Sequence, residues 1–82
     1  MNLKYVKREV EKIISKRFLP DITIKEDDIL TECGMDSVEM IQLVIELETH
    51  FEFEFEDEKL SYETLRSINT IVSYIYMRLG EH

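Results

Sequence analysis

The sequence predicts an all-α fold: a small four-helix bundle of three longer helices and one short helix, with a long loop between the first two. Three observations lead to this prediction. Apolar residues recur at helical spacing in three separate segments. Residues with helix-capping side chains stand immediately before the later segments. The 82 residues include two glycines and one proline, and no repeat or linker divides them, so residues 1–82 are expected to form a single domain.

The first helix is predicted over residues 3–18. Its apolar positions keep the spacing of one helical face, and they are Leu3, Val6, Val10, Ile13, Ile14 and Phe18. Pro20 is expected to end this helix, because proline has no amide hydrogen and clashes with the preceding turn. Residues 20–36 follow as an irregular loop. Loops of that length in small domains are often functional.

The second helix is predicted to begin sharply after Asp36 and to run to about His50. Asp36 can act as its N-cap, and Glu39, three residues later, completes a capping box. Residues 51–56 then alternate phenylalanine with glutamate, which predicts a loop that inserts aromatic rings into the core. A short third helix is predicted over residues 62–65 and a fourth over residues 68–79, each after a serine cap.

Composition and charge exclude several classes of protein. The chain has 18 acidic and 10 basic side chains, a net charge of −8, which argues against nucleic-acid binding because phosphates are bound by Lys and Arg. No apolar run approaches the roughly 20 residues needed to span a bilayer, so membrane insertion is not expected. A single cysteine, Cys33, cannot form an internal disulfide, which suits a reducing cytoplasm.

The charge is distributed unevenly along the chain. Residues 1–19 carry six basic and two acidic side chains, a net of +4, and the remaining residues carry four basic and sixteen acidic ones, a net of −12. One interpretation is that the basic segment packs beside the acidic body. The other is that an acidic surface steers basic partners toward the protein. Both can hold.

Self-contained catalysis is not expected, and we predict that the chain is not an enzyme. His50 stands 13 residues after Ser37 on the same predicted helix, a separation of about 20 Å at 1.5 Å per residue. A general base must lie within hydrogen-bonding distance of its nucleophile. No metal site is predicted, because the acids near residues 27–36 lack the spacing of a calcium loop. Cys33 is interpreted as a small buried residue rather than a nucleophile.

Ser37 is the residue of most interest. If Asp36 caps the second helix, Ser37 occupies the first helical position, and its hydroxyl is expected to point outward. A phosphate attached there would lie beside unpaired backbone N–H groups and the positive end of the helix dipole, although the Asp36 carboxylate opposes it as a like charge. The alternative is that Asp-Ser simply starts a helix.

The second helix also carries more apolar surface than a small bundle can cover. Val38 and Ile45 are therefore expected to be at least partly exposed beside polar neighbours. We define the docking face by five residues, which are Val38, Glu39, Gln42, Ile45 and Glu46. An apolar strip beside carboxylates fits a basic, hydrophobic partner. For Ile41, coverage by the loop over residues 20–36 is an open alternative.

The sequence around Ser37 resembles the acyl carrier protein family, the phosphopantetheine-binding carrier proteins. Gly34-Met35-Asp36-Ser37-Val38 is similar to the family's Gly-x-Asp-Ser-Leu attachment motif, and Ile41-x-x-Val44-x-x-Leu47-Glu48 continues the family pattern. Residues 51–58 and 67–75 are similar to its C-terminal half. The departures from the pattern are Cys33 and Val38 in place of Leu, Gln42 in place of an acid and Glu56 in place of Pro.

The resemblance implies a stand-alone acyl carrier protein, monomeric, with 4′-phosphopantetheine covalently attached to Ser37. A separate phosphopantetheinyl transferase would bring coenzyme A and Mg²⁺, and Asp36 would help to position the metal during the transfer. The arm would carry acyl groups as thioesters to acyl-transferring, ligating or synthase enzymes with basic docking patches, in fatty acid, polyketide or related biosynthesis.

Two alternatives remain open at this point. One is an aminoacyl or peptidyl carrier of a non-ribosomal or D-alanyl transfer pathway, which the phenylalanine-rich residues 51–55 resemble equally well. The other, from a different class, is an unmodified acidic helical protein-interaction module in which Ser37 is only a surface residue beside a cap.

Overall fold

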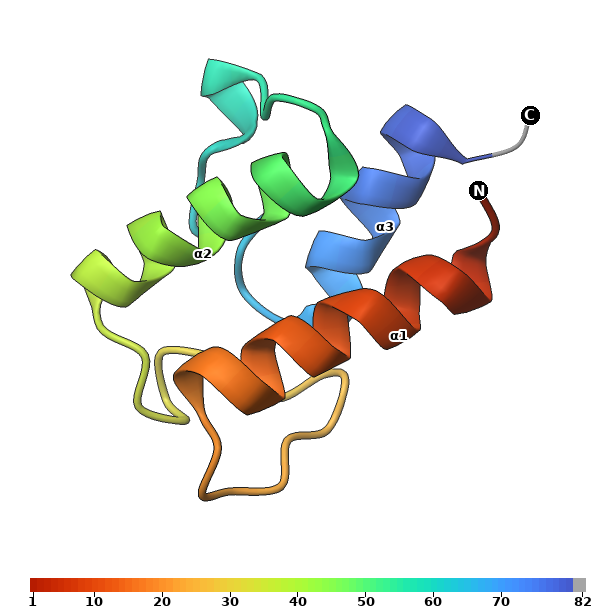
Figure 1. The fold of residues 1–82 in the computed structure, drawn as a ribbon. Coiled ribbons are helices and arrows are strands. Elements are labelled where there is room, and N and C mark those ends of the chain that lie inside the picture. The colour runs from red at the N-terminus through yellow and green to blue at the C-terminus, as the bar shows by residue number, and fades with distance from the viewer. Residues whose placement is uncertain (81–82) are drawn as a thin grey trace.

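Three α-helices form the protein in the computed structural model, which describes residues 1–80 (Figure 1). Helix α1 spans Leu3–Ile13 and continues without interruption as a π-helical turn over Ile14–Phe18. Helix α2 spans Ser37–Phe51, and α3 spans Ile68–Leu79. The described residues contain no strand. The all-α class is therefore confirmed, and the three longer helices lie where the periodicity predicts them.

The predicted short helix over residues 62–65 is wrong. Those residues form a single hydrogen-bonded turn in which the Leu65 amide donates to the Ser61 carbonyl over 3.1 Å. The turn cannot continue, because Ser67 must take an extended conformation, with φ at −146°, to cap α3. The short helical element in the described chain between α2 and α3 is instead a 3₁₀ turn over Asp57–Lys59. The bundle therefore has three helices rather than four.

The end of α1 is wider than an ordinary helical turn. The Leu19 amide donates to the carbonyl of Ile14, five residues earlier, over 2.9 Å, which is the hydrogen-bonding pattern of a π-helix. Pro20 follows directly, so the helix ends where the proline predicts. The π turn sets the positions of Arg17 and Phe18 relative to α2.

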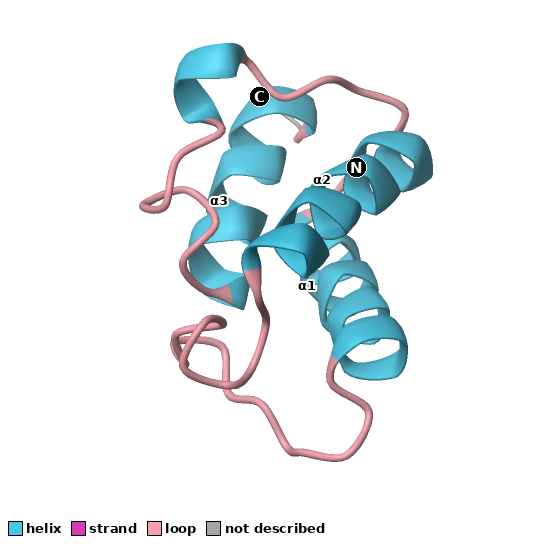
Figure 2. Cartoon of the chain, turned by 90° about the vertical axis from the view of Figure 1, so that its left-hand side faces the viewer, coloured by secondary structure: helices cyan, strands magenta, loops and turns pink. Residues whose placement is uncertain are grey.

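The core lies between the three helices and is entirely apolar at its centre. α1 contributes Val6 and Val10, the π turn contributes Ile14, α2 contributes Leu43 and Leu47, and α3 contributes Ile71 and Ile75, all fully buried. Two long connections join these helices at their ends; Figure 2 draws them in pink, except for the helical turn between α2 and α3 in cyan. No helix within residues 1–80 is both long enough and apolar enough to cross a membrane.

The alternating segment at the end of α2 inserts its aromatic rings into the core as predicted, although Phe51 is the last residue of α2 and not part of the loop. Phe51, Phe53 and Phe55 are buried and the glutamates between them are exposed. The ring of Phe55 stacks on that of Tyr74 in α3, with centroids 5.2 Å apart. The Arg78 guanidinium donates to the Tyr74 hydroxyl over 2.7 Å and lies over the Phe53 ring. These contacts fasten the connection to α3.

The long loop between α1 and α2 is also held against α3. The Leu30 amide donates to the Arg66 carbonyl over 2.9 Å, and the Asn69 amide donates to the Glu26 carbonyl over 2.8 Å. The side chains of Leu30 and Met35 are buried in the core. The loop is therefore attached to the rest of the molecule at Glu26 and Leu30, and again at Met35 directly before α2.

Two basic residues of the segment 1–19 pair with carboxylates of the rest of the chain. Lys7 forms an ion pair with Glu26 in the long loop, and Arg17 pairs with Glu46 in α2 over 2.9 Å. Hydrogen bonding and the negative charge of Glu26 raise the pKa of Lys7. The expectation that the basic segment packs beside the acidic body is thus confirmed.

Candidate functional site

The start of α2 is a complete capping box. The Asp36 Oδ1 accepts a hydrogen bond from the Glu39 amide over 2.8 Å, and the Glu39 Oε1 accepts one from the Asp36 amide over 3.2 Å. Asp36 is extended, with φ at −90° and ψ at 177°, as an N-cap residue should be. The helix boundary predicted from these two acids is confirmed.

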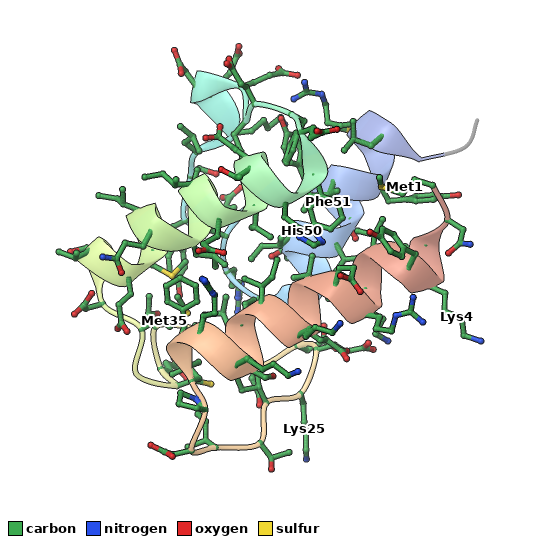
Figure 3. All side chains as sticks on the ribbon, viewed as in Figure 1. Met1, Lys4, Lys25, Met35, His50 and Phe51 are labelled. Carbon is green, nitrogen blue, oxygen red and sulfur yellow. The ribbon has the colours of Figure 1, made fainter. Side chains whose placement is uncertain are left out.

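Ser37 occupies the first position of α2 and is exposed. Its hydroxyl makes no hydrogen bond to any of residues 1–80. Met35, two residues before it, marks this end of the molecule in Figure 3, on the side opposite Met1. The hydroxyl therefore projects from the first turn of a capped helix, next to the exposed Asp36 carboxylate, and is open to another molecule.

The residues that precede Ser37 each have a distinct structural role. Gly34 has φ at +117°, a conformation that side chains rarely adopt. The Met35 amide donates to the Leu30 carbonyl over 3.1 Å, and its side chain is 2% exposed. The glycine turns the chain, the methionine anchors it in the core, and Asp36 starts the helix. Together, these three residues place the hydroxyl of Ser37 on the surface.

His50 is engaged far from Ser37, at the other end of α2. Its Nε2 lies 3.1 Å from the Glu9 Oε1 on α1, and its ring meets the edge of Phe51 (Figure 3). The described chain brings no three of its histidines, cysteines, aspartates and glutamates together as metal ligands. Ser37 therefore has no histidine base beside it, as the helical spacing predicts.

Cys33 is half-buried and its thiol is kept protonated. Burial raises the pKa of Cys33, and the negative charges of Asp28 and Glu32 raise it further. Because the thiolate is the nucleophilic form, this cysteine is poorly suited to react at neutral pH.

The apolar side chains of the docking face are exposed as predicted. Val38 is 61% exposed and Ile45 is 56% exposed. Ile41, between them in the sequence, is 63% exposed, so the long loop does not cover it. Together the three side chains form an apolar strip along the outer side of α2.

The polar residues of the docking face have different surroundings. Gln42 is exposed, and Glu39 accepts the hydrogen bond of the capping box. Glu46 accepts a hydrogen bond from the Arg17 Nη1 over 2.9 Å. Sequence reasoning missed Arg17, because 29 residues separate it from its partner and no local pattern links the two.

Two surface hollows adjoin this ion pair. One, of about 380 Å³, is lined by Arg17, Phe18, Gln42, Ile45 and Glu46. The other, of about 350 Å³, is lined by Lys12, Ile13, Lys16, Arg17, Glu46 and His50. Both lie between the end of α1 and α2, so the ion pair borders each of them.

Comparison with known proteins identifies the family. Residues 4–75 match the family described as the phosphopantetheine attachment site. The D-alanyl carrier protein of Streptococcus mutans is 31% identical over 71 residues, which cover 85% of this chain and 90% of that protein. The acyl carrier protein of Campylobacter fetus is 39% identical over 56 residues, 68% of this chain and 70% of that protein.

Solved structures show the same fold. A crystal structure of an acyl carrier protein from Thermotoga maritima has a TM-score of 0.72 and 27% identity, and covers 94% of this chain and 89% of its own. A chain in the complex of Bradyrhizobium japonicum glycine:[carrier protein] ligase with its cognate carrier protein also has a TM-score of 0.72, at 19% identity, with 94% and 97% coverage. The chain therefore belongs to the phosphopantetheine-binding carrier proteins, the acyl carrier protein family.

Proposed function

We propose that Ser37 is the residue to which 4′-phosphopantetheine is attached, and that the chain is a stand-alone acyl carrier. The observation that carries the proposal is the exposed hydroxyl of Ser37, which makes no hydrogen bond and lies at the first position of a capped helix. A group bound there meets no covering element of the chain. Family membership makes attachment at such a serine the natural expectation.

The attachment reaction needs little from the carrier itself. The Ser37 Oγ attacks the β-phosphorus of coenzyme A, a new phosphodiester bond forms, and adenosine 3′,5′-bisphosphate leaves. The transferase supplies the base that takes the hydroxyl proton, because His50 is paired with Glu9 at the other end of α2. The phosphodiester anion then lies near the amide groups of the first helical turn, which favour negative charge.

Asp36 fits a role in holding Mg²⁺ during this transfer. One of its carboxylate oxygens caps the helix, and the other makes no hydrogen bond within the described chain. Carboxylate oxygens are the ligands that Mg²⁺ prefers, together with substrate phosphates and water. The free oxygen lies one residue from the attacking hydroxyl, which suits a metal shared with the transferase.

The arm supplies a terminal thiol that holds cargo as a thioester, and the chain presents that cargo to other enzymes. Acyl-transferring, ligating and synthase enzymes are the partners of such a carrier, and the chain works as a monomer in the cytoplasm. Its own thiol does not compete for the cargo, because burial keeps Cys33 protonated.

An aminoacyl cargo is the second candidate. The D-alanyl carrier protein of Streptococcus mutans is 31% identical over 85% of this chain, and the acyl carrier protein of Thermotoga maritima is 31% identical over 88%, so the two kinds of carrier are about equally similar to it. Holo-protein incubated with D-alanine, glycine or fatty acids and the matching ligases separates the two cargo classes by the mass that is added.

Intact-mass measurement after incubation with coenzyme A, Mg²⁺ and a broad-specificity phosphopantetheinyl transferase tests the attachment. We expect a gain of one phosphopantetheine per chain and none for Ser37→Ala. Ser73→Ala, which changes an exposed serine on α3, is the matched control and should be modified normally. An unmodified wild-type chain, beside a known carrier that is modified, would favour the unmodified interaction module instead.

The docking face is proposed as the surface through which partners reach Ser37. We expect Val38→Asp to slow modification by the transferase about tenfold, because it places a charge in an apolar contact worth roughly 1–2 kcal/mol. Ile22→Asp makes the same kind of change at an exposed apolar position of the long loop and should leave the rate unchanged. Equal effects of the two substitutions would argue against the docking face.

A further inference from the structure

The ion pair between Arg17 and Glu46 changes the charge of the docking face. The Arg17 Nη1 donates to the Glu46 Oε1 over 2.9 Å, and the two side chains are 56% and 36% exposed. Glu46 is thus the one carboxylate of the docking face that a cation of the same chain contacts. Glu39, the other acid, accepts a hydrogen bond from a neutral amide and contacts no cation of the described chain.

The surroundings of Glu46 add further positive charge. Lys12, Lys16 and Arg17 line the same surface hollow as Glu46. Of these cations, Lys12 also lies 3.9 Å from Glu9, which His50 contacts from α2. Lys16 has no carboxylate partner in the described chain. On the side of Glu46 that faces the end of α1, the balance of charge is therefore positive. The acids Glu48, Glu52 and Glu54 line a separate hollow with Ile45.

The position of Arg17 is fixed by the backbone that carries it. The π turn ends with the hydrogen bond from the Leu19 amide to the Ile14 carbonyl. Phe18, next to Arg17, packs against the core, and Ile14 is fully buried. Buried neighbours on this turn place the guanidinium beside α2, so the ion pair does not depend on a mobile loop.

We propose that Arg17 masks Glu46 and thereby makes the docking face acidic only at its first turn. The partner that fits this surface places cations opposite Asp36 and Glu39 and apolar side chains, rather than cations, opposite Ile45. The inference rests on the proposed function, because the partners concerned are enzymes that act at Ser37. It names Arg17 as a residue that determines which of those enzymes associate quickly.

The rate of phosphopantetheinylation measures this masking. Each variant is incubated with coenzyme A, Mg²⁺ and a broad-specificity transferase that has a basic docking patch. The reaction is followed at about 20 mM and about 200 mM NaCl, because the two conditions differ strongly in electrostatic screening. The variants are Arg17→Ala, Glu46→Gln, the double variant and Lys4→Ala. Lys4 is exposed near the N-terminus (Figure 3) and has no carboxylate partner within residues 1–80. Lys4→Ala therefore changes the net charge by the same amount as Arg17→Ala without breaking an ion pair.

Removal of Arg17 should raise kcat/KM at low salt by about two- to fivefold, because it exposes the Glu46 carboxylate to a basic partner. The gain should shrink at high salt. Lys4→Ala should change the rate by less than half as much. Glu46→Gln alone should slow the reaction at low salt, because it leaves the Arg17 charge unpaired in front of a basic partner. The double variant should lose the gain, because the exposed carboxylate is then absent.

Three results would overturn the masking. The first is a kcat/KM for Arg17→Ala equal to that of Lys4→Ala. The second is a kcat/KM for Arg17→Ala below that of the wild-type chain, and the third is a gain for Arg17→Ala that persists in the double variant. Circular dichroism checks that each variant is folded, and Arg17→Gln replaces Arg17→Ala if the latter is not. Failure of the wild-type chain to be modified at all is a separate result: it overturns attachment at Ser37 and the masking with it.

Discussion

Two of residues 1–80 have backbone conformations in the left-handed region. Gly34 has φ at +117° and Glu52, which follows the last residue of α2, has φ at +55°. Glycine adopts such angles freely, but any other residue pays a penalty from its Cβ, about 1–2 kcal/mol for an ordinary side chain. In the turn before Ser37, the residue with positive φ is a glycine, Gly34, and it adopts this conformation without strain. In the turn after α2 it is Glu52, whose side chain makes the same region of φ unfavourable.

Glu52→Gly is expected to stabilise the protein. The substitution relieves the left-handed strain and, after the added entropy of the unfolded chain is subtracted, should raise the free energy of unfolding by about 0.5–1 kcal/mol. Urea denaturation followed by circular dichroism measures the change. Glu54→Gly, at an exposed position with no positive φ, should instead lower stability by about 0.5–1 kcal/mol. A loss of stability in both variants would contradict the argument.

The ionisation of Cys33 should depend on folding. Burial, assisted by Asp28 and Glu32, holds its pKa above the ordinary value of 9.0. The folded state therefore favours the neutral thiol, and that contribution to stability is present below pH 9.0 and lost as the pH rises through the folded pKa. Alkylation by iodoacetamide should show its midpoint at a higher pH in the folded chain than in urea. Identical midpoints would show that folding does not shift this pKa.

At the scale of the element, α2 depends on a cap that also lies beside the exposed Ser37 hydroxyl. The Asp36 carboxylate satisfies the Glu39 amide, and it is also the group proposed to hold Mg²⁺. The capping role of Asp36 and its proposed role in holding Mg²⁺ can be tested separately, because only the second role requires a negatively charged side chain.

Asp36→Asn and Asp36→Ala distinguish these roles. Asparagine caps helices about as well as aspartate, so Asp36→Asn should change the free energy of unfolding by less than about 0.5 kcal/mol, and Asp36→Ala should lower it by about 1 kcal/mol. Both should slow attachment at Ser37, since both remove the carboxylate. Thermal denaturation and intact-mass kinetics provide the two measurements. Normal attachment in Asp36→Asn would remove the metal-holding role and leave the cap.

The elements show what the sequence could predict and what it could not. The capping box, the apolar periodicity and the alternation over residues 51–56 are local patterns, and each predicted its element correctly. The residues after Ser61 also have a local capping signal, yet they form only one turn, because Ser67 must be extended to start α3. The π turn over Ile14–Phe18 has no simple signature beyond the proline that follows it. The exposure of Ser37 followed from its position after the cap.

At the scale of the whole molecule, contacts between distant residues decide what local patterns cannot. The pairing of Arg17 with Glu46 joins two segments 29 residues apart, and neither residue carries a signal for the other. The exposure of Ile41 depended in the same way on where the long loop runs. Local reasoning therefore predicted the exposure of Ser37 and part of the apolar strip beside it, but not the charge of the surroundings.

Net charge should make the protein more stable at higher salt. The chain carries −8 at neutral pH in 82 residues, so repulsion among carboxylates exceeds the attraction of the ion pairs and is screened by added ions. We expect the melting temperature to rise by a few degrees between about 20 mM and about 500 mM NaCl. Glu58→Gln, which removes an exposed acid outside the ion pairs, should show a smaller rise. A fall with salt would mean that the ion pairs dominate.

The N-terminus and the end of α3 lie on the side of the molecule opposite the first turn of α2 (Figure 1). An affinity tag, a fluorescent protein or a solid support joined before Met1 would therefore leave the serine free for tethering. The chain could be immobilised in one orientation, loaded with cargo and washed, so that each enzyme of an assembly line is supplied in turn to the same molecules.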